Sequence, residues 1–254
     1  MTLYFIGLGL ADEKDISLKG LELIKKCESV YLENYTSVLG CSVEKLENLY
    51  GKKIILADRE LVEKKAEQTI LSDAKKKNVA FLVVGEPMAA TTHTDLMLRA
   101  KELNIRFRIV HNASIMSAIG ITGLQLYKFG KTTSIPFIDD KFQPETAYNV
   151  LKENNSNKMH TLVLLDLRPE EKRFMTVNNA IKILLDIEKK RKENIFTEKT
   201  LCIGCARIGS ENQMIKAGKA KELLELDFGK EVHCLIVSSE MHFMEEEALK
   251  LWHV

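Results

Sequence analysis

The sequence predicts an α/β protein of two domains, with a parallel sheet in the first and a mixed sheet in the second. Short apolar runs alternate with longer amphipathic stretches over the 254 residues, which is the order expected when helices connect neighbouring parallel strands. Several runs are apolar at consecutive positions, as in strands covered by helices on both faces. A content of 45% hydrophobic and 29% charged residues is typical of a folded globular protein.

The first half alternates most regularly. Leu18, Leu21 and Ile24 recur at helical spacing. Asp15 or Ser17, just before them, is the expected N-cap of this helix. The other elements expected here are helices at 59–76 and 94–103, and strands at 3–8, 29–32, 54–56, 80–84 and 107–110.

The strands of the second half are fewer and lie further apart, which favours a mixed sheet. No Pro/Gly-rich linker separates the halves, so the boundary is placed after the last strand of the first set, giving domains 1–112 and 113–254. The elements expected in the second half are strands at 161–167, 200–206 and 232–238 and a long helix at 177–192.

Composition excludes several classes of protein. Lys and Arg number 37 against 36 Asp and Glu, a formal net charge of +1, so no general field attracts nucleic acid or acidic membranes. No stretch approaches the roughly 20 apolar residues that span a bilayer. The five cysteines are odd in number and scattered, which favours a reducing, cytoplasmic location over a disulfide framework.

The first candidate ligand loop, Gly7-Leu8-Gly9-Leu10, directly follows a strand. Glycines let the backbone turn tightly and approach a ligand. A dinucleotide-binding fingerprint would need a third glycine where Asp12 stands, and a helix that begins before Ser17. A purely structural turn stays an equal alternative to a ligand loop.

The second and third candidate loops also follow strands. Glu86, in a loop rich in small and hydroxyl residues, could accept hydrogen bonds from a ligand or simply cap the next helix. Ser114 opens a small-residue helix whose first N–H groups suit an anion, although the residues by themselves favour Ser114 as a plain N-cap.

Two further features have simpler structural interpretations. His233, at the start of a strand, resembles a hydrogen-bonded structural histidine more than a catalyst. Cys202 and Cys205 have CxxC spacing but lie in an apolar strand with no second pair, so strand packing is favoured over metal or redox chemistry. No metal site is expected, and no catalytic nucleophile or general base is identified.

Longer segments resemble one family. The diphthine synthases, within the tetrapyrrole-methylase-like group, are similar to LYFIGLGLADEKDISLKGLE, VAFLVVGEPMAATTHTDLMLRA, HNASIMSAIGITGLQLYKFGKTTSIPF, MHTLVLLDL and CARIGSENQMIKAG. The ATTH and HNASIM…GLQLYKFG blocks together distinguish this family within the group. The resemblance implies two α/β domains, a homodimer, and S-adenosyl-L-methionine held in the cleft between the domains and released as S-adenosyl-L-homocysteine.

The resemblance also assigns residues and a reaction. It implies successive methylation of the 3-amino-3-carboxypropyl-histidine of translation elongation factor 2 in diphthamide biosynthesis, with room for the acceptor around Ala89, Ala90, Ser114 and Ala118. The sequence leaves open whether three or four methyl groups are transferred. The implied cofactor-binding residues, mostly through backbone contacts, are Leu10, Glu86, Ala89, Ser114, Ile115, Leu165, Ile208 and His233.

Two departures from the family pattern accompany this assignment. Glu86 stands where the family usually has Asp. The segment 168–175 is short, as in archaeal members, and lacks the insertion that eukaryote-like members carry there. Three alternatives are kept: a methyltransferase acting on a tetrapyrrole, a nicotinamide-dependent oxidoreductase, and a non-catalytic module that binds elongation factor 2.

Overall fold

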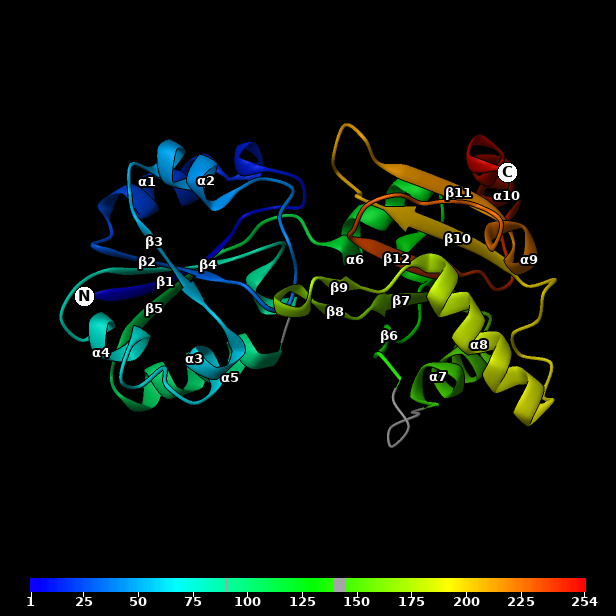
Figure 1. Ribbon diagram of the computed structural model, residues 1–254, viewed down its shortest axis with the longest axis horizontal. Coiled ribbons are helices and arrows are strands. Elements are labelled where there is room, and N and C mark those ends of the chain that lie inside the picture. Colours follow the sequence, from blue (N-terminus) through cyan, green and yellow to red (C-terminus); the bar gives the residue numbers. More distant parts are fainter. Residues whose placement is uncertain (90, 139–144) are drawn as a thin grey trace. The chain divides into compact units, whose positions relative to one another are not determined.

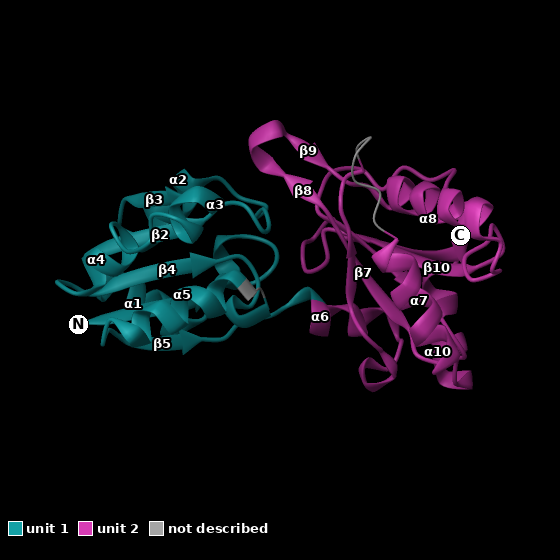
Figure 2. Cartoon of the chain, turned by 90° about the horizontal axis from the view of Figure 1, so that it is seen from below, with its two compact units in different colours: residues 1–115 teal, residues 116–254 magenta. Residues whose placement is uncertain are grey.

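The computed structural model describes residues 1–89, 91–138 and 145–254, and for Thr91 the backbone alone. The chain divides into two compact units, Met1–Ile115 (unit 1) and Met116–Val254 (unit 2) (Figure 2). The predicted domains, 1–112 and 113–254, place their boundary slightly earlier in the chain and stay a prediction. None of the helices that the structure describes is long and apolar enough to cross a membrane.

Unit 1 is a parallel five-stranded sheet in the order β3-β2-β4-β1-β5, so the parallel sheet predicted for the first half is confirmed (Figure 1). Its central strands are buried because both faces are covered by helices. The strands are β1 (Thr2–Gly7), β2 (Ser29–Glu33), β3 (Ile54–Ala57), β4 (Val79–Val83) and β5 (Arg106–Val110).

Each face of this sheet has its own hydrophobic core. α1 (Leu18–Lys26) and α2 (Val43–Tyr50) cover one face, with Ile24 and Leu46 fully buried. α3 (Arg59–Glu63), α4 (Ile70–Ala74) and α5 (Thr91–Glu102) cover the other. Of the two predicted caps of α1, Ser17 is the N-cap, because its side chain accepts from the Gly20 N–H.

The single helix predicted at 59–76 is wrong. The structure has α3 and α4 with a turn between them, although Val62, Ala66 and Ile70 share one core as a continuous helix would require. The Thr69 hydroxyl donates to the Lys65 carbonyl at 2.8 Å, and the Thr69 N–H donates to Ala66 instead. A side-chain hydroxyl therefore takes the acceptor that the helical N–H would use.

Unit 2 has a mixed five-stranded sheet in the order β11-β10-β12-β7-β6, which confirms the prediction for the second half. Only the β6–β7 pair is parallel among the described pairs of this sheet. Two strands of this five-stranded sheet were not predicted, β6 (Thr133–Ile135) and β11 (Met214–Lys219). β6 is very short, and β11 has polar and glycine residues, so neither shows a clear apolar run. The others are β7 (Thr161–Leu165), β10 (Leu201–Ala206) and β12 (His233–Val237).

Helices also pack on this mixed sheet. α7 (Thr146–Ser156), α8 (Val177–Arg191) and α9 (Ala220–Leu223) pack on one face, and α8 confirms the long helix predicted at 177–192. The predicted strand 161–167 stops at Leu165, where the chain turns into a hairpin of β8 (Leu167–Arg168) and β9 (Arg173–Phe174). α6 (Ile115–Ala118) and α10 (Phe243–Leu249) complete the helices.

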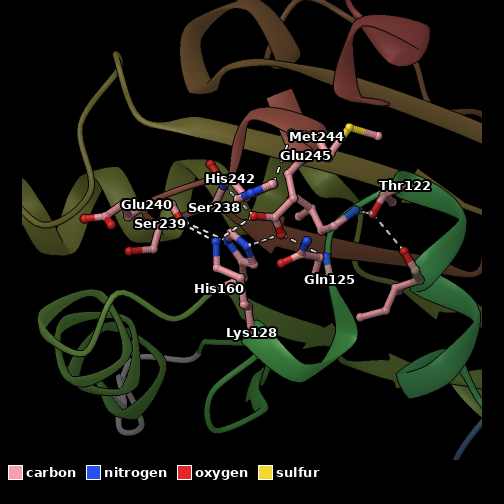
Figure 3. Close-up of polar contacts among 12 residues, drawn as sticks. Thr122, Gln125, Lys128, His160, Ser238, Ser239, Glu240, His242, Met244 and Glu245 are labelled. Atoms are coloured by element: carbon pink, nitrogen blue, oxygen red, sulfur yellow. Dashed lines mark hydrogen bonds and ion pairs between the residues drawn. The ribbon is translucent and has the colours of Figure 1, made fainter. Parts of the chain in front are cut away.

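A buried carboxylate joins α10 to the rest of unit 2 (Figure 3). Glu245 is fully buried and accepts from the Gln125 N–H and the His242 N–H, both at 2.8 Å. Its oxygens also lie 2.6 Å from Lys128 Nζ and 3.0 Å from His160 Nε2. Burial by itself raises the pKa of Glu245, but these four donors lower it to about 2.

Replacing Glu245 by Gln tests this link. We expect Glu245→Gln to lower the free energy of unfolding at pH 7 by about 2–3 kcal/mol, because bonds to a buried charge are lost. The folded pKa lies below the ordinary value of 4.5, so the carboxylate stabilises the fold fully above that pH and less as pH falls toward 2. Urea denaturation should therefore show the difference from wild type shrinking over this window.

The matched control is Glu246→Gln, on the next, exposed position of the same helix. This substitution should change the free energy of unfolding by less than about 0.5 kcal/mol. Equal losses at positions 245 and 246 would contradict the interpretation.

Candidate functional site

The candidate site of unit 1 lies where the loops after β1, β4 and β5 meet. These strands are parallel neighbours, so their carboxyl ends share one edge of the sheet. The chain leaves β1 toward β2 in one direction and leaves β4 toward β5 in the other. Such a reversal between adjacent strands is where open α/β sheets bind ligands.

The glycines of the first loop are required by close packing. A Cβ on Gly7 would lie 2.5 Å from the Gly85 carbonyl oxygen and 2.7 Å from Asn112 Cβ, and one on Gly9 would overlap Asp15 Cβ. Gly9 also has φ of +82°, and its carbonyl accepts from the Gly85 N–H at 2.8 Å. The turn therefore serves to bring two loops into contact.

Asp15 holds the first loop through hydrogen bonds to its backbone. Its carboxylate accepts from the N–H groups of Leu10 at 3.0 Å and Ala11 at 2.7 Å. Asp12 caps the short 3-10 helix that follows, and α1 begins only at Leu18. The late helix confirms that the dinucleotide fingerprint is absent. Leu10, a predicted cofactor contact, has its N–H bonded to Asp15.

Glu86 joins the second loop to the third. One carboxylate oxygen lies 3.1 Å from the Met88 N–H and 2.9 Å from His111 Nδ1, and the other accepts from the Asn112 N–H at 3.0 Å. Partial burial acts to raise the pKa of Glu86, but the donors from His111, Met88 and Asn112 outweigh it and lower the pKa. Glu86 is thus an ionised anchor within unit 1.

Asn112 joins the third loop to the first. Its side-chain N–H groups donate to the Gly7 carbonyl at 2.9 Å and the Asp15 carbonyl at 3.1 Å, while its oxygen accepts from the Ala113 N–H. The sequence predicted Asp15 only as a possible N-cap of α1 and indicated no role for Asn112. Their signal was position alone, since each is a short polar residue in a loop after a strand.

The other predicted residues of unit 1 lie around these anchors. Ala89 ends the short 3-10 helix Pro87–Ala89 and is exposed. Ser114 and Ile115 are half-buried at the start of α6. The structure therefore brings Leu10, Glu86, Ala89, Ser114 and Ile115 to one edge of one sheet. Ala90 lies outside the described residues.

Unit 2 gathers its three predicted residues in the same way. Leu165 ends β7, Ile208 follows β10, and His233 begins β12. β12 is the middle strand of these three and is antiparallel to both neighbours, with Ala206 opposite His233 and Leu164 opposite Cys234. All three residues are therefore at one end of adjacent strands, and all are buried.

His233 is held as a neutral imidazole. Its Nε2 donates to the Lys230 carbonyl at 2.8 Å, and its Nδ1 accepts from the Val177 N–H at 3.4 Å. Burial is the main cause that lowers the pKa of His233, and nearby Arg207 adds to it. This bonding fits a structural histidine, and the cofactor contact of His233 stays a prediction.

The cysteines confirm the packing interpretation. Cys202 and Cys205 are buried within β10, and Cys205 stands opposite Cys234 on β12. Burial raises the pKa of the Cys202 thiol, so it is neutral and unreactive. Among the residues in the described ranges, no group of three or more His, Cys, Asp or Glu is placed to hold a metal ion.

The family model of the Tetrapyrrole (Corrin/Porphyrin) Methylases matches residues 2–224. The chain belongs to this family. It is 49% identical to a diphthine methyl ester synthase of Dictyostelium discoideum, over 100% of this chain and 99% of the relative. It is also 49% identical to a diphthine synthase of Methanocaldococcus jannaschii, over 98% and 97% of the two chains.

Solved structures agree with the sequence relatives. A crystal structure of a diphthine synthase superposes with a TM-score of 0.91 at 37% identity, over 100% of this chain and 96% of that one. Within the tetrapyrrole methylases, the chain therefore belongs with the diphthine synthases and is a methyltransferase. The two α/β halves predicted from the sequence are the architecture of this family.

Substituting Gly7 tests the packing of the three loops. We expect Gly7→Ala to lower the free energy of unfolding by about 1–3 kcal/mol, because the new methyl group would collide with backbone of the second loop. Gly120→Ala is the matched control, since its Cβ would meet only side-chain atoms at 3.4 Å or more. Denaturant unfolding of both variants measures the difference, and a Gly7→Ala protein as stable as wild type would contradict the packing argument.

Proposed function

We propose that this chain transfers methyl groups from S-adenosyl-L-methionine to the 3-amino-3-carboxypropyl-histidine of translation elongation factor 2, releasing S-adenosyl-L-homocysteine. The observation that carries the proposal is the 49% identity to a diphthine methyl ester synthase over the full length of both chains. The edge of the unit 1 sheet where the loops after β1, β4 and β5 meet, here called the loop edge, supports the proposal. This edge has the topology of a ligand site.

The proposed cofactor contacts are the residues predicted from the sequence in each unit. Leu10, Glu86, Ala89, Ser114 and Ile115 would contact S-adenosyl-L-methionine from unit 1, and Leu165, Ile208 and His233 from unit 2. The unit 1 loops suit such a ligand because small residues expose their backbone. Ala89 and Ala113 in these loops are exposed.

The chemistry explains why these loops contain no dedicated nucleophile. The bound sulfonium supplies an activated methyl group with a neutral thioether as leaving group. The residues of this chain have to hold the acceptor in line with that methyl and keep water away. Good alignment contributes roughly 7–11 kcal/mol to lowering a barrier of this kind. Loops that hold the reactants in fixed positions are therefore sufficient for catalysis of such a reaction.

Transfer of label tests the proposal. Purified chain, labelled S-adenosyl-L-methionine and elongation factor 2 carrying the 3-amino-3-carboxypropyl group should give labelled factor, whereas factor with an unmodified histidine should stay unlabelled. No transfer to the modified factor would overturn the proposal.

Mass spectrometry of the product counts the methyl groups. One relative of each name, a diphthine methyl ester synthase and a diphthine synthase, is 49% identical to this chain. A fourth methyl would be an ester on the carboxylate, which mild alkali removes, whereas methyl groups on nitrogen survive the same treatment.

We further infer that the chain acts as a homodimer in the cytoplasm, as the resemblance implies. All five cysteines are free thiols, in keeping with a reducing compartment. Light scattering of the purified protein measures the oligomeric state, and a monomer at micromolar concentration would contradict the dimer.

Glu86 provides a direct test of the site. We expect Glu86→Ala to raise the dissociation constant for S-adenosyl-L-homocysteine about tenfold or more, the equivalent of one lost charged hydrogen bond. The carboxylate no longer ties Met88 to Asn112 in this variant. Isothermal titration calorimetry gives the constant.

Asp95→Ala is the matched control for Glu86→Ala. Asp95 is an exposed carboxylate of α5 in the same unit, and it pairs with Arg99 at 2.8 Å. The Asp95 carboxylate is 61% exposed and forms none of the bonds between the loops, so binding should be unchanged. Equal affinities of Glu86→Ala and wild type would remove Glu86 from the site.

A further inference from the structure

His93 lies under the second loop of unit 1, in the first turn of α5. Its ring is fully buried and packs edge-on against Phe81 of β4, with ring centroids 5.6 Å apart at 70°. Phe81 packs in the same manner on Phe5 of β1, at 5.8 Å and 75°. The imidazole is therefore held against the central strands of the sheet.

The ring has one tautomer that satisfies its contacts. His93 Nδ1 lies 2.7 Å from the Pro87 carbonyl oxygen. A carbonyl oxygen only accepts, so Nδ1 carries the hydrogen and Nε2 is the unprotonated nitrogen of a neutral ring. Burial lowers the pKa of His93, which keeps the ring neutral at physiological pH.

Contacts of the other ring nitrogen do not account for a histidine at this position. Within the described ranges, His93 Nε2 is buried and has no hydrogen-bond partner. A buried acceptor without a donor is destabilising, and a phenylalanine would fill the same space against Phe81 without that penalty. The feature that only the imidazole supplies is the hydrogen bond to Pro87.

Pro87 is the residue through which this bond reaches the site. It is buried and begins the 3-10 helix that ends at Ala89. A Cβ on Gly7 would lie 3.0 Å from Pro87 Cδ, so the proline ring packs against the first loop. Glu86 holds the same helix by accepting from the Met88 N–H. Hydrogen bonds to the Glu86 carboxylate and from the His93 ring of α5 therefore both hold this turn.

We infer that His93 is a positioning residue for the methyl donor. Its Nδ1–H···O=C bond to Pro87 keeps the turn that carries Glu86 and Ala89 in the conformation that binds S-adenosyl-L-methionine. This inference rests on the proposed function, because it assigns His93 a role in the same cofactor site without contact to the cofactor.

Two substitutions separate positioning from packing. His93→Phe keeps the ring on Phe81 but removes the donor, and His93→Asn places an amide N–H near the position of Nδ1 but loses ring packing. We expect His93→Phe to bind S-adenosyl-L-homocysteine about fivefold to tenfold more weakly than wild type. His93→Asn should bind within about twofold of wild type.

Stability should follow the opposite order. His93→Phe retains the packing and should melt at or above the temperature of His93→Asn, which leaves space beside Phe81. A purely structural role would make affinity follow stability, so weaker binding by the asparagine variant than by the phenylalanine variant would overturn the inference. Wild-type affinity in His93→Phe would overturn it equally.

The tautomer of His93 can be measured on the wild-type protein, so this test does not depend on the folding of a variant. Nitrogen-15 NMR of histidine-labelled protein should show His93 as the neutral Nδ1–H tautomer, and an Nε2–H tautomer would overturn the inference. Wild-type protein that binds no S-adenosyl-L-homocysteine would overturn the proposed function itself. In contrast, normal wild-type binding with an unaffected His93→Phe would reject only the role of His93.

Discussion

The loop edge of unit 1 depends on side chains that replace missing strand partners. Beyond the ends of β1, β4 and β5 no neighbouring strand hydrogen-bonds the backbone, so its N–H and carbonyl groups need other partners. Asp15, Glu86 and Asn112 supply them, each by bonding N–H or carbonyl groups of a loop. Because Glu86 and Asn112 each connect two loops, three separate turns behave as one surface.

Glycine makes that surface compact. The contacts that Gly7 makes with the second and third loops leave no space for a side chain, and the Gly85–Gly9 hydrogen bond lies in the same region. Interiors packed this closely transmit small displacements. A group added at Gly7 would therefore move the residues that are proposed to hold the cofactor.

A rigid surface suits methyl transfer because the donor is already activated. The enzyme needs alignment more than a nucleophile, and alignment comes from residues whose own positions are fixed by further contacts. Ionised Glu86, neutral His93 and neutral His233 are each held by hydrogen bonds to backbone. In unit 2, Glu245 holds α10 by the same principle, with a charge satisfied by four donors.

The sequence by itself determined the alternation of strands and helices, the parallel and mixed character of the two sheets, and the family. Apolar periodicity and local capping are properties of neighbouring residues, so Ser17 and the helix at 177–192 were predictable. The break between α3 and α4 was not, since Val62, Ala66 and Ile70 keep helical spacing across it. Only the tertiary structure decided the strand order that brings β1, β4 and β5 together. It also decided the partners of Asp15, Asn112 and His93, which come from residues far away in the chain or from backbone that local patterns do not place.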